Sequence, residues 1–154
     1  MKKLLTGIPI VIFSFLIFAQ SYTPVDEGSK VHFVIDNFGI ATGGDFTGLS
    51  GKIKFDPADL TATDFDVKNY PRLLFKSTRI TKTNKDGYLY MFGNITIKGV
   101  MKEIQFPFTA TPKNGGYLFE GSFKLNRRDF NVGGRSLVLS DELTVSLSIF
   151  AKGS

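Results

Sequence analysis

Cysteine and tryptophan are absent from the 154-residue sequence, and His32 is its single histidine. Without a thiol, the chain cannot carry out cysteine catalysis, hold an iron–sulfur cluster or bind zinc through thiolates. A single histidine also excludes multi-histidine metal sites and most histidine-dependent triads. Because no disulfide can form, the core must be stabilised by packing.

The first 19 residues differ from the rest of the chain. Lys2 and Lys3 precede the apolar run "LLTGIPIVIFSFLIF" (4–18), and the small residue Ala19 then leads into polar sequence. This order describes a secretory signal peptide cleaved near Ala19, and the run is short for a membrane span. We therefore expect a signal peptide at residues 1–19 and a periplasmic or secreted protein, with an uncleaved anchor as the less favoured alternative.

The net charge of the chain is +5, and it falls to +3 without Lys2 and Lys3, which leaves 17 basic and 14 acidic residues. The lysines are scattered through apolar segments, whereas a nucleic-acid-binding surface needs a clustered basic patch. We therefore expect a solvated basic exterior and no nucleic-acid partner.

Apolar residues after Ser21 recur at every second position. Such alternation occurs in "KVHFVID" (30–36), "GKIKF" (51–55) and "ELTVSLSIFA" (142–151), among other segments. Side chains alternate between the two faces of a strand, so each segment predicts a strand with one buried face. Turn residues such as Gly99 separate these segments. The sequence therefore predicts one all-β domain over residues 20–154, a mainly antiparallel sheet closed into a barrel or sandwich.

Thirteen of the 16 phenylalanines follow Ala19. One interpretation is an ordinary aromatic core. The other is a hollow barrel around one elongated apolar ligand, because small antiparallel barrels can enclose such a molecule. Alternation does not distinguish a filled barrel from a hollow one.

The polar residues do not form a recognisable catalytic constellation. His32 lies on the strand face opposite Phe33, where a solvent-facing role is expected. Arg127 and Asp129 in "NRRDF" (126–130) form either an ion pair that fixes a turn, which we favour, or an anion site. We expect no catalytic residue, so the chain is not predicted to be an enzyme.

Four aspartates, Asp56, Asp59, Asp64 and Asp66, form a loose acidic group along the chain. Their spacing does not match the calcium loop of an EF-hand. We therefore expect no metal site.

The segment "GNITIKGVMKEIQFPF" (93–108) is similar to the signature hairpin of the YceI-like family. Four further segments resemble parts of that family in the same order along the chain. They are "GSKVHFVIDNFGIATGGDFTGLSGKIKFDPADL" (28–60), "FDVKNYPRLLFKSTRI" (65–80), "FKLNRRDFNVGG" (123–134) and "LSDELTVSLSIFAK" (139–152).

The resemblance implies an exported, periplasmic protein with a lipocalin-like antiparallel β-barrel, usually of eight strands. It also implies an elongated interior for a polyisoprenoid chain, such as that of an isoprenoid quinone or a polyprenyl lipid, without a covalently bound cofactor. We therefore predict an exported binding protein for a long apolar ligand, with membrane contact for ligand exchange. The alternative is a structural or stress-protective exported barrel with a filled core.

Residues on the alternating faces supply the candidate ligand contacts. The candidates are Phe33, Ile35, Phe55, Phe75, Phe106 and Phe119. Binding would be driven by apolar area leaving water, at about 25 cal/mol per Å² before ordering costs.

The chain departs from the family pattern between residues 60 and 65, where only "TATD" (61–64) stands in place of a further strand and a helical stretch. We therefore expect a barrel of about six to eight strands. A smaller barrel, a gap in the wall and an internally deleted sequence are open alternatives. An open wall would expose strand edges and favour a homodimer or aggregation. The signature hairpin also has Lys98 and Met101 where the family usually has His and Thr.

Overall fold

The computed structural model of the protein describes residues 20–62, 64–70 and 73–153. The signal peptide expected at residues 1–19 lies outside these ranges, as do the side chains of residues 62–72. The described strands belong to one antiparallel sheet, which confirms the all-β prediction. In the described part of the chain, no helix is both long and apolar enough to cross a bilayer.

The sheet has nine strands, and two short 3-10 helices lie in the connections. The elements in chain order are β1 (Gln20–Pro24), β2 (Lys30–Asn37), β3 (Ile40–Phe55), η1 (Leu60–Ala62), β4 (Asp64–Tyr70), β5 (Leu73–Lys82), β6 (Leu89–Ile97), β7 (Val100–Lys113), β8 (Gly116–Asn126), η2 (Arg127–Phe130) and β9 (Leu139–Gly153).

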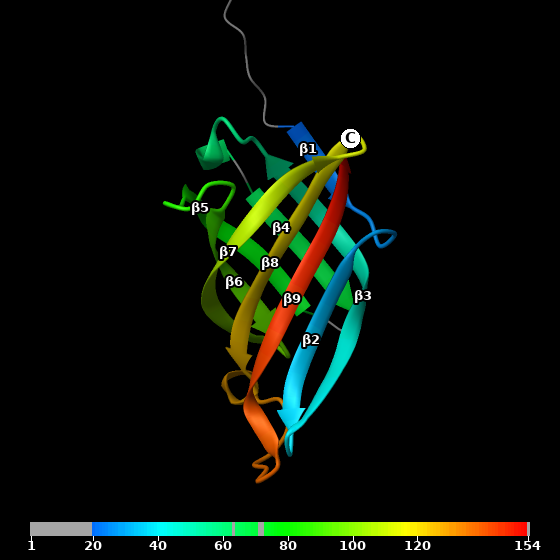
Figure 1. Cartoon of the computed structure of the whole chain (residues 1–154), viewed down its shortest axis with the longest axis vertical. Helices are drawn as coiled ribbons and strands as arrows, with labels where there is room; N and C mark the ends of the chain where they lie inside the picture. The colour runs from blue at the N-terminus through cyan, green and yellow to red at the C-terminus, as the bar shows by residue number, and fades with distance from the viewer. Residues whose placement is uncertain (1–19, 63, 71–72, 154) are drawn as a thin grey trace, which may run out of the picture.

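The sheet closes on itself as a barrel (Figure 1). Its ring runs β3-β2-β9-β8-β7-β6-β5-β4 and returns to β3. The closing ladder pairs β3 with β4, from Thr47 opposite Tyr70 to Lys54 opposite Asp64. The predicted lipocalin-like barrel is therefore confirmed, and the alternative of a gap in its wall is wrong. With its edges paired, the ring lacks the exposed ladder that was our reason to expect a second copy of the chain.

Strand β1 completes the barrel wall at one end of this ring. It pairs with β3 through Gln20 opposite Phe55, and with β9 through Pro24 opposite Ala151. Since β2 also pairs with both β3 and β9, β1 continues the course of β2 after an interruption at residues 25–29. The short strand thus fills the space between β3 and β9 at the end of the barrel that carries the C-terminus (Figure 1).

The turn expected around Gly99 is a two-residue hairpin loop. Ile97 pairs with Val100, and the intervening Lys98 and Gly99 have φ angles of 51° and 79°. Two-residue hairpins require this left-handed conformation, because it matches the twist of the flanking strands. Gly99 adopts it without steric cost.

Alternation along the strands gives the barrel one apolar interior. In β9, for example, the inward residues Val145 and Ile149 are buried while the intervening Ser146 is exposed. Ile53 of β3 and Ile95 of β6, strands that do not pair with each other, are fully buried in the same cluster. The interior is therefore a single hydrophobic core to which the strands of the ring contribute in turn.

Some inward phenylalanines have their ring edges close to glycines of the adjacent strand. A Cβ atom on Gly44 would stand 2.8 Å from the ring of Phe33, and a Cβ on Gly93 would stand 2.5 Å from the ring of Phe75. Such distances are too short for any carbon contact, so a side chain at Gly44 would displace the ring of Phe33. A Cβ on Gly93 would also stand 2.7 Å from the backbone oxygen of Lys76, so that position needs glycine. The glycines therefore leave room for these rings beside the adjacent strand.

The core predicts a large loss of stability for F119A. Phe119 is 2% exposed, and its ring centroid lies 5.3 Å from that of Phe55 in an edge-to-face contact. We expect the free energy of unfolding to fall by about 3–5 kcal/mol, because the substitution leaves a cavity. Urea denaturation measures this change. As the control, F38A removes a ring that is 80% exposed and should change stability by less than about 0.5 kcal/mol; equal losses in the two variants would contradict the assignment of the core.

Candidate apolar binding site

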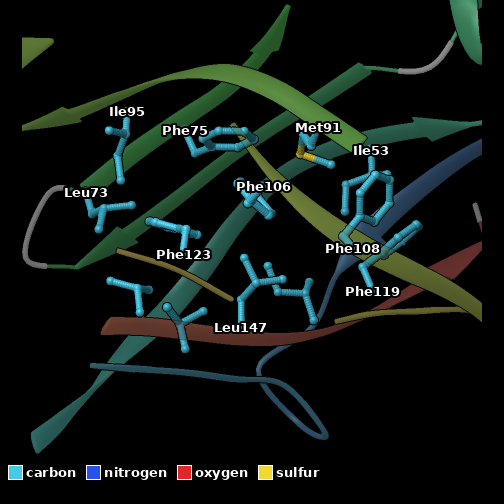
Figure 2. A pocket seen from close by; sticks show the side chains of 13 residues that line it. Ile53, Leu73, Phe75, Met91, Ile95, Phe106, Phe108, Phe119, Phe123 and Leu147 are labelled. Carbon is cyan, nitrogen blue, oxygen red and sulfur yellow. The ribbon is translucent and has the colours of Figure 1, made fainter. Parts of the chain in front are cut away.

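The centre of the barrel holds a cavity of about 50 Å³, here called the inner cavity (Figure 2). All its lining residues are apolar, and they come from seven strands of the ring. They are Val31, Ile53, Leu73, Phe75, Met91, Ile95, Phe106, Phe108, Phe119, Phe123, Val145, Leu147 and Ile149. A cavity with such walls offers water no hydrogen-bond partner and favours apolar molecules.

A larger cavity of about 290 Å³, the outer cavity, lies toward η2 and the segment that precedes β9. Phe33, Ile35 and Phe46 line it from β2 and β3, and the rings of Phe33 and Phe46 are 5.6 Å apart between centroids. Phe130 of η2 and Leu143 of β9 line the other side. Its lining is apolar apart from the buried guanidinium of Arg127 and the backbone.

The two cavities are neighbours that share Leu73 and Val145 as lining residues. Successive inward residues of β9 mark the route between them: Leu143 lines the outer cavity, Val145 lines both, and Leu147 lines the inner cavity. Because inward residues of a strand stand about 7 Å apart, the two cavities extend along the barrel axis. Together they form an elongated apolar interior.

Aromatic rings close the inner end of this interior, near β1. The ring centroid of Tyr117 lies 4.9 Å from that of Phe55 and 5.4 Å from that of Tyr22. Burial of Tyr22 raises the pKa of its hydroxyl, with a smaller contribution from Tyr117. Phe55 and Phe119 belong to the same group of rings. The apolar route therefore runs from this aromatic floor toward η2.

The candidate contacts expected from the sequence fall into three places. Phe33 and Ile35 line the outer cavity. Phe75, Phe106 and Phe119 line the inner cavity. Phe55 is 3% exposed and belongs to the aromatic floor. Their contact with a ligand stays a prediction.

Several lining residues were not among those candidates. Met91 and Val145 are examples in the inner cavity, and Leu125 and Phe130 are examples in the outer cavity. The alternation in β9 placed Val145 on the same face as Leu143, Leu147 and Ile149, but did not show that this face is the inward one. Phe130, in contrast, follows a strand end in η2, where alternation carries no information.

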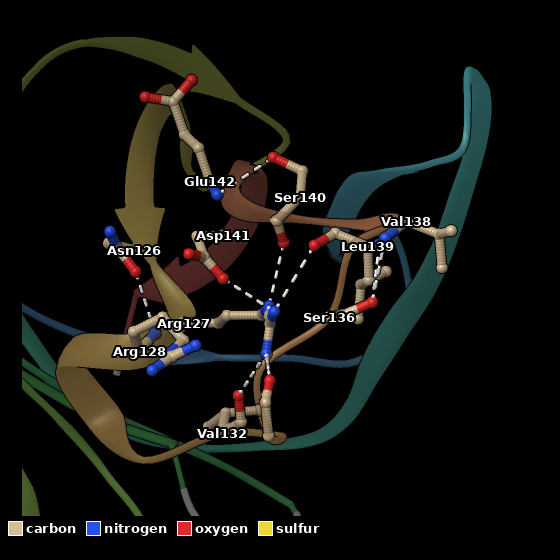
Figure 3. Close-up of polar contacts among 11 residues, drawn as sticks. Asn126, Arg127, Arg128, Val132, Ser136, Val138, Leu139, Ser140, Asp141 and Glu142 are labelled. Carbon is tan, nitrogen blue, oxygen red and sulfur yellow. Dashed lines mark hydrogen bonds and ion pairs between the residues drawn. The ribbon is translucent and has the colours of Figure 1, made fainter.

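Arg127 fixes the outer end of the barrel (Figure 3). Its side chain is 2% exposed, and Nη2 lies 2.7 Å from Oδ1 of Asp141. The guanidinium also donates to four backbone carbonyls, two in the segment between η2 and β9 and two at the start of β9. These bonds are Nε to Ser140 at 2.9 Å, Nη1 to Val132 at 3.1 Å, Nη1 to Gly134 at 2.9 Å and Nη2 to Leu139 at 3.4 Å.

The favoured interpretation of Arg127 as an ion pair that fixes a turn is therefore correct, but the expected partner is wrong. Asp141 forms the ion pair, and Asp129 is exposed on η2. The planar guanidinium reaches several carbonyls at once, as a lysine could not. Since its donors already bind protein acceptors, Arg127 is not a free anion site.

His32 lies on the outer face of β2, as expected, and pairs with Asp45 of β3. Its Nδ1 is 2.7 Å from Oδ1 of Asp45, and Lys30 lies 3.7 Å from the same oxygen. The hydrogen bond from His32 lowers the pKa of the exposed Asp45 carboxyl, and Lys30 adds to this effect. This group stabilises the outer surface, where side chains of adjacent strands meet in pairs.

The aspartates of the acidic group have local roles where the structure describes them. Asp56 accepts a hydrogen bond from the Ala58 N–H at 2.8 Å, and Asp59 accepts from Thr61. The side chains of Asp64 and Asp66 lie outside the described residues. Among the side chains that are described, no three His, Cys, Asp or Glu residues come together in a group that could hold a metal ion.

The fold and its interior define a class: a closed, lipocalin-like β-barrel around an elongated apolar cavity. The YceI-like domain family matches residues 61–151, more than half of the chain. The chain therefore belongs to the YceI-like family. Among curated proteins, none matches it significantly.

Solved structures support the same fold. BcnA of Burkholderia cenocepacia superimposes with a TM-score of 0.77 at 22% identity, over 84% of this chain and 99% of that protein. A polyisoprenoid-binding domain from Saccharophagus degradans gives 0.63 at 12% identity, over 88% and 99%. A mutant CJ YceI protein gives 0.61 at 18% identity, over 100% and 99%. At these identities the similarity shows the fold alone.

The ion pair and hydrogen bonds of Arg127, here called the Arg127 clasp, predict a loss of stability for R127A. The substitution leaves buried carbonyls without a charged donor, so we expect the free energy of unfolding to fall by about 3 kcal/mol. The control R127K keeps the charge but cannot form the planar fork, and it should recover less than half of the loss. Urea denaturation measures both values. An R127A protein as stable as the parent would refute the clasp.

Proposed function

We propose that this chain is an exported binding protein that holds a long apolar ligand, an isoprenoid quinone or a polyprenyl lipid, inside its barrel without a covalent bond. The main observation in support of this proposal is the elongated apolar interior formed by the inner and outer cavities. The polyisoprenoid-binding domain of Saccharophagus degradans, which shares the fold, supports an isoprenoid as the ligand class. The apolar lining supports binding over catalysis, since it provides no general acid, base or nucleophile.

The volumes indicate how such a ligand would occupy the barrel. Pockets for small organic ligands measure roughly 300–1,000 Å³, and the outer cavity with about 290 Å³ lies just below the lower limit of this range. The inner cavity with about 50 Å³ does not. A long chain would therefore enter through the outer cavity and widen the inner one.

Side chains in the inner cavity can make this room. Met91 is unbranched and adapts its shape to irregular surroundings. Phe106 lies between two further rings, 4.7 Å from Phe123 and 6.0 Å from Phe75 between centroids. A ligand chain that displaces one of these rings replaces one apolar contact by another, so the energetic cost is partly offset.

The alternative function, a structural or stress-protective barrel with a filled core, is favoured by one observation. The inner cavity is small because the rings of Phe75, Phe106 and Phe123 occupy the middle of the barrel. In that case the outer cavity would be a packing defect without a resident molecule. Ligand uptake by the purified protein distinguishes the two functions.

The inward face of β9 provides a test of ligand length. V145F places a ring at the junction of the two cavities, whereas L143F obstructs the outer cavity itself. We expect V145F to bind farnesol, with three isoprene units, but to lose at least about tenfold in affinity for a ten-unit polyprenol. L143F should lose affinity for both. Native mass spectrometry with each alcohol measures binding.

S146F is the matched control, because Ser146 is the neighbouring residue on the outward, exposed face of β9. It should bind both alcohols like the parent protein. If the parent protein takes up neither alcohol, the proposed function is wrong and the filled barrel is supported. If V145F and S146F behave alike, the ligand does not pass the junction.

A further inference from the structure

Large apolar side chains are exposed at the end of the barrel beyond the outer cavity. Phe38 is 80% exposed, Leu137 is fully exposed, and Ile40 and Val138 are largely accessible. The Phe38 N–H donates to the Val138 carbonyl at 2.7 Å, so the β2–β3 turn and the segment before β9 lie together. Figure 1 shows both segments protruding at the end opposite the C-terminus. We call these four residues the apolar tip.

Phe38 is unfavourable at its own position. It is the first residue of a two-residue turn with Gly39 and has a φ of 54°. The equivalent positions in two other hairpins of this chain, with φ angles of 51° and 44°, are the polar Lys98 and Asn114. The left-handed conformation favours glycine, asparagine or aspartate, and a bulky aromatic residue there is strained. Neither the turn nor the core explains a phenylalanine at this site.

The apolar tip continues the wall of the outer cavity. Ile35, near the end of β2, and Leu139, at the start of β9, both line that cavity. Asn37, adjacent to the tip, pairs with Leu139 across the two strands. An apolar path therefore connects the exposed tip to the interior of the barrel.

Basic side chains surround the apolar tip. Arg128 and Arg135 line a surface hollow together with Leu137. Lys98 reaches the same end, where its Nζ donates to the Asn131 carbonyl at 3.1 Å.

Four acidic side chains lie near the tip, and two of them are paired with basic groups. Asp36 accepts the Gly39 N–H at 2.9 Å, and Asp129 lies exposed on η2. Asp141 is paired with Arg127, and Glu142 is 2.7 Å from Lys124. Arg128, Arg135 and Lys98 therefore exceed Asp36 and Asp129 by one positive charge, and this excess favours an anionic surface over a neutral one.

We propose that the apolar tip docks on an anionic lipid bilayer and inserts Phe38 and Leu137 into its interface, with Arg128 and Arg135 facing the lipid headgroups. A fluid bilayer accepts protruding side chains without a matching pocket. A protein partner would need about 800 Å² on each side, which a few side chains on a convex end do not supply. Docked in this way, the outer cavity faces the lipid. The role in ligand exchange rests on the proposed function, whereas the docking contacts do not.

The absence of tryptophan from the sequence makes F38W a direct probe of docking. The experiment mixes the processed, exported protein with vesicles of phosphatidylcholine containing about one third phosphatidylglycerol and no isoprenoid. We expect the indole emission to shift to shorter wavelength and to be quenched by brominated acyl chains. Vesicles of phosphatidylcholine alone should give a weaker response, because the headgroup attraction is missing.

N114W is the matched control, because Asn114 has the same position in the turn with Gly115 at the opposite end of the barrel. The Gly115 carbonyl there accepts the Gly153 N–H, next to the C-terminus. Its emission should not respond to vesicles. If the emission of F38W did not change with vesicles, or if N114W responded equally, the proposal would be overturned. F38N, which suits the turn and preserves the fold, should lower the vesicle partition coefficient by about tenfold; unchanged partitioning would also overturn it.

The outcomes separate this proposal from the proposed function. If the protein binds polyprenol in solution but the emission of F38W does not respond to vesicles, the proposed function stands and the docking proposal is wrong. If F38W inserts into vesicles but the protein binds no polyprenol, the docking proposal stands and the proposed function is wrong.

Discussion

The backbone ladder between β3 and β4 closes the ring, and the apolar interior depends on that closure. Without it, two long strands would present unpaired N–H and C=O groups, and the inward faces of the sheet would meet water. With it, the inward residues of the whole ring share one interior. The connection between these strands contains only the short η1 and its flanking residues, which places β3 and β4 side by side.

Within the closed ring, the two ends of the barrel differ in how they are sealed. At the β1 end, Tyr22, Phe55 and Tyr117 pack as a group of rings and leave little space. At the other end, the seal is a connecting segment whose carbonyls are gathered by one buried guanidinium, that of Arg127. A seal of polar bonds around a short segment can open locally at lower cost than a packed aromatic cluster. This difference favours ligand entry at the η2 end, where the larger cavity lies.

Most of the fold could be predicted from the alternation of apolar and polar residues in the sequence. It grouped the residues of β2 and β9 by face without showing which face is inside, and the turn residue Gly99 indicated the hairpin, because each depends on residues close in the chain. Closure across the missing segment was left open, since pairing of distant strands depends on the whole ring. The partner of Arg127 was misassigned to the adjacent Asp129, because the ion pair with Asp141 forms only once β9 returns beside β8. The division of the interior into two cavities depends on ring orientations, such as that of Phe75 over Gly93, which a period-two pattern does not contain.

Native mass spectrometry of the protein purified from its own host, under conditions that preserve non-covalent complexes, tests the central claim most directly. The account predicts an additional mass that is released into organic solvent and identified as an isoprenoid chain. A protein that shows only its polypeptide mass, and gains none when incubated with polyprenol, would contradict it.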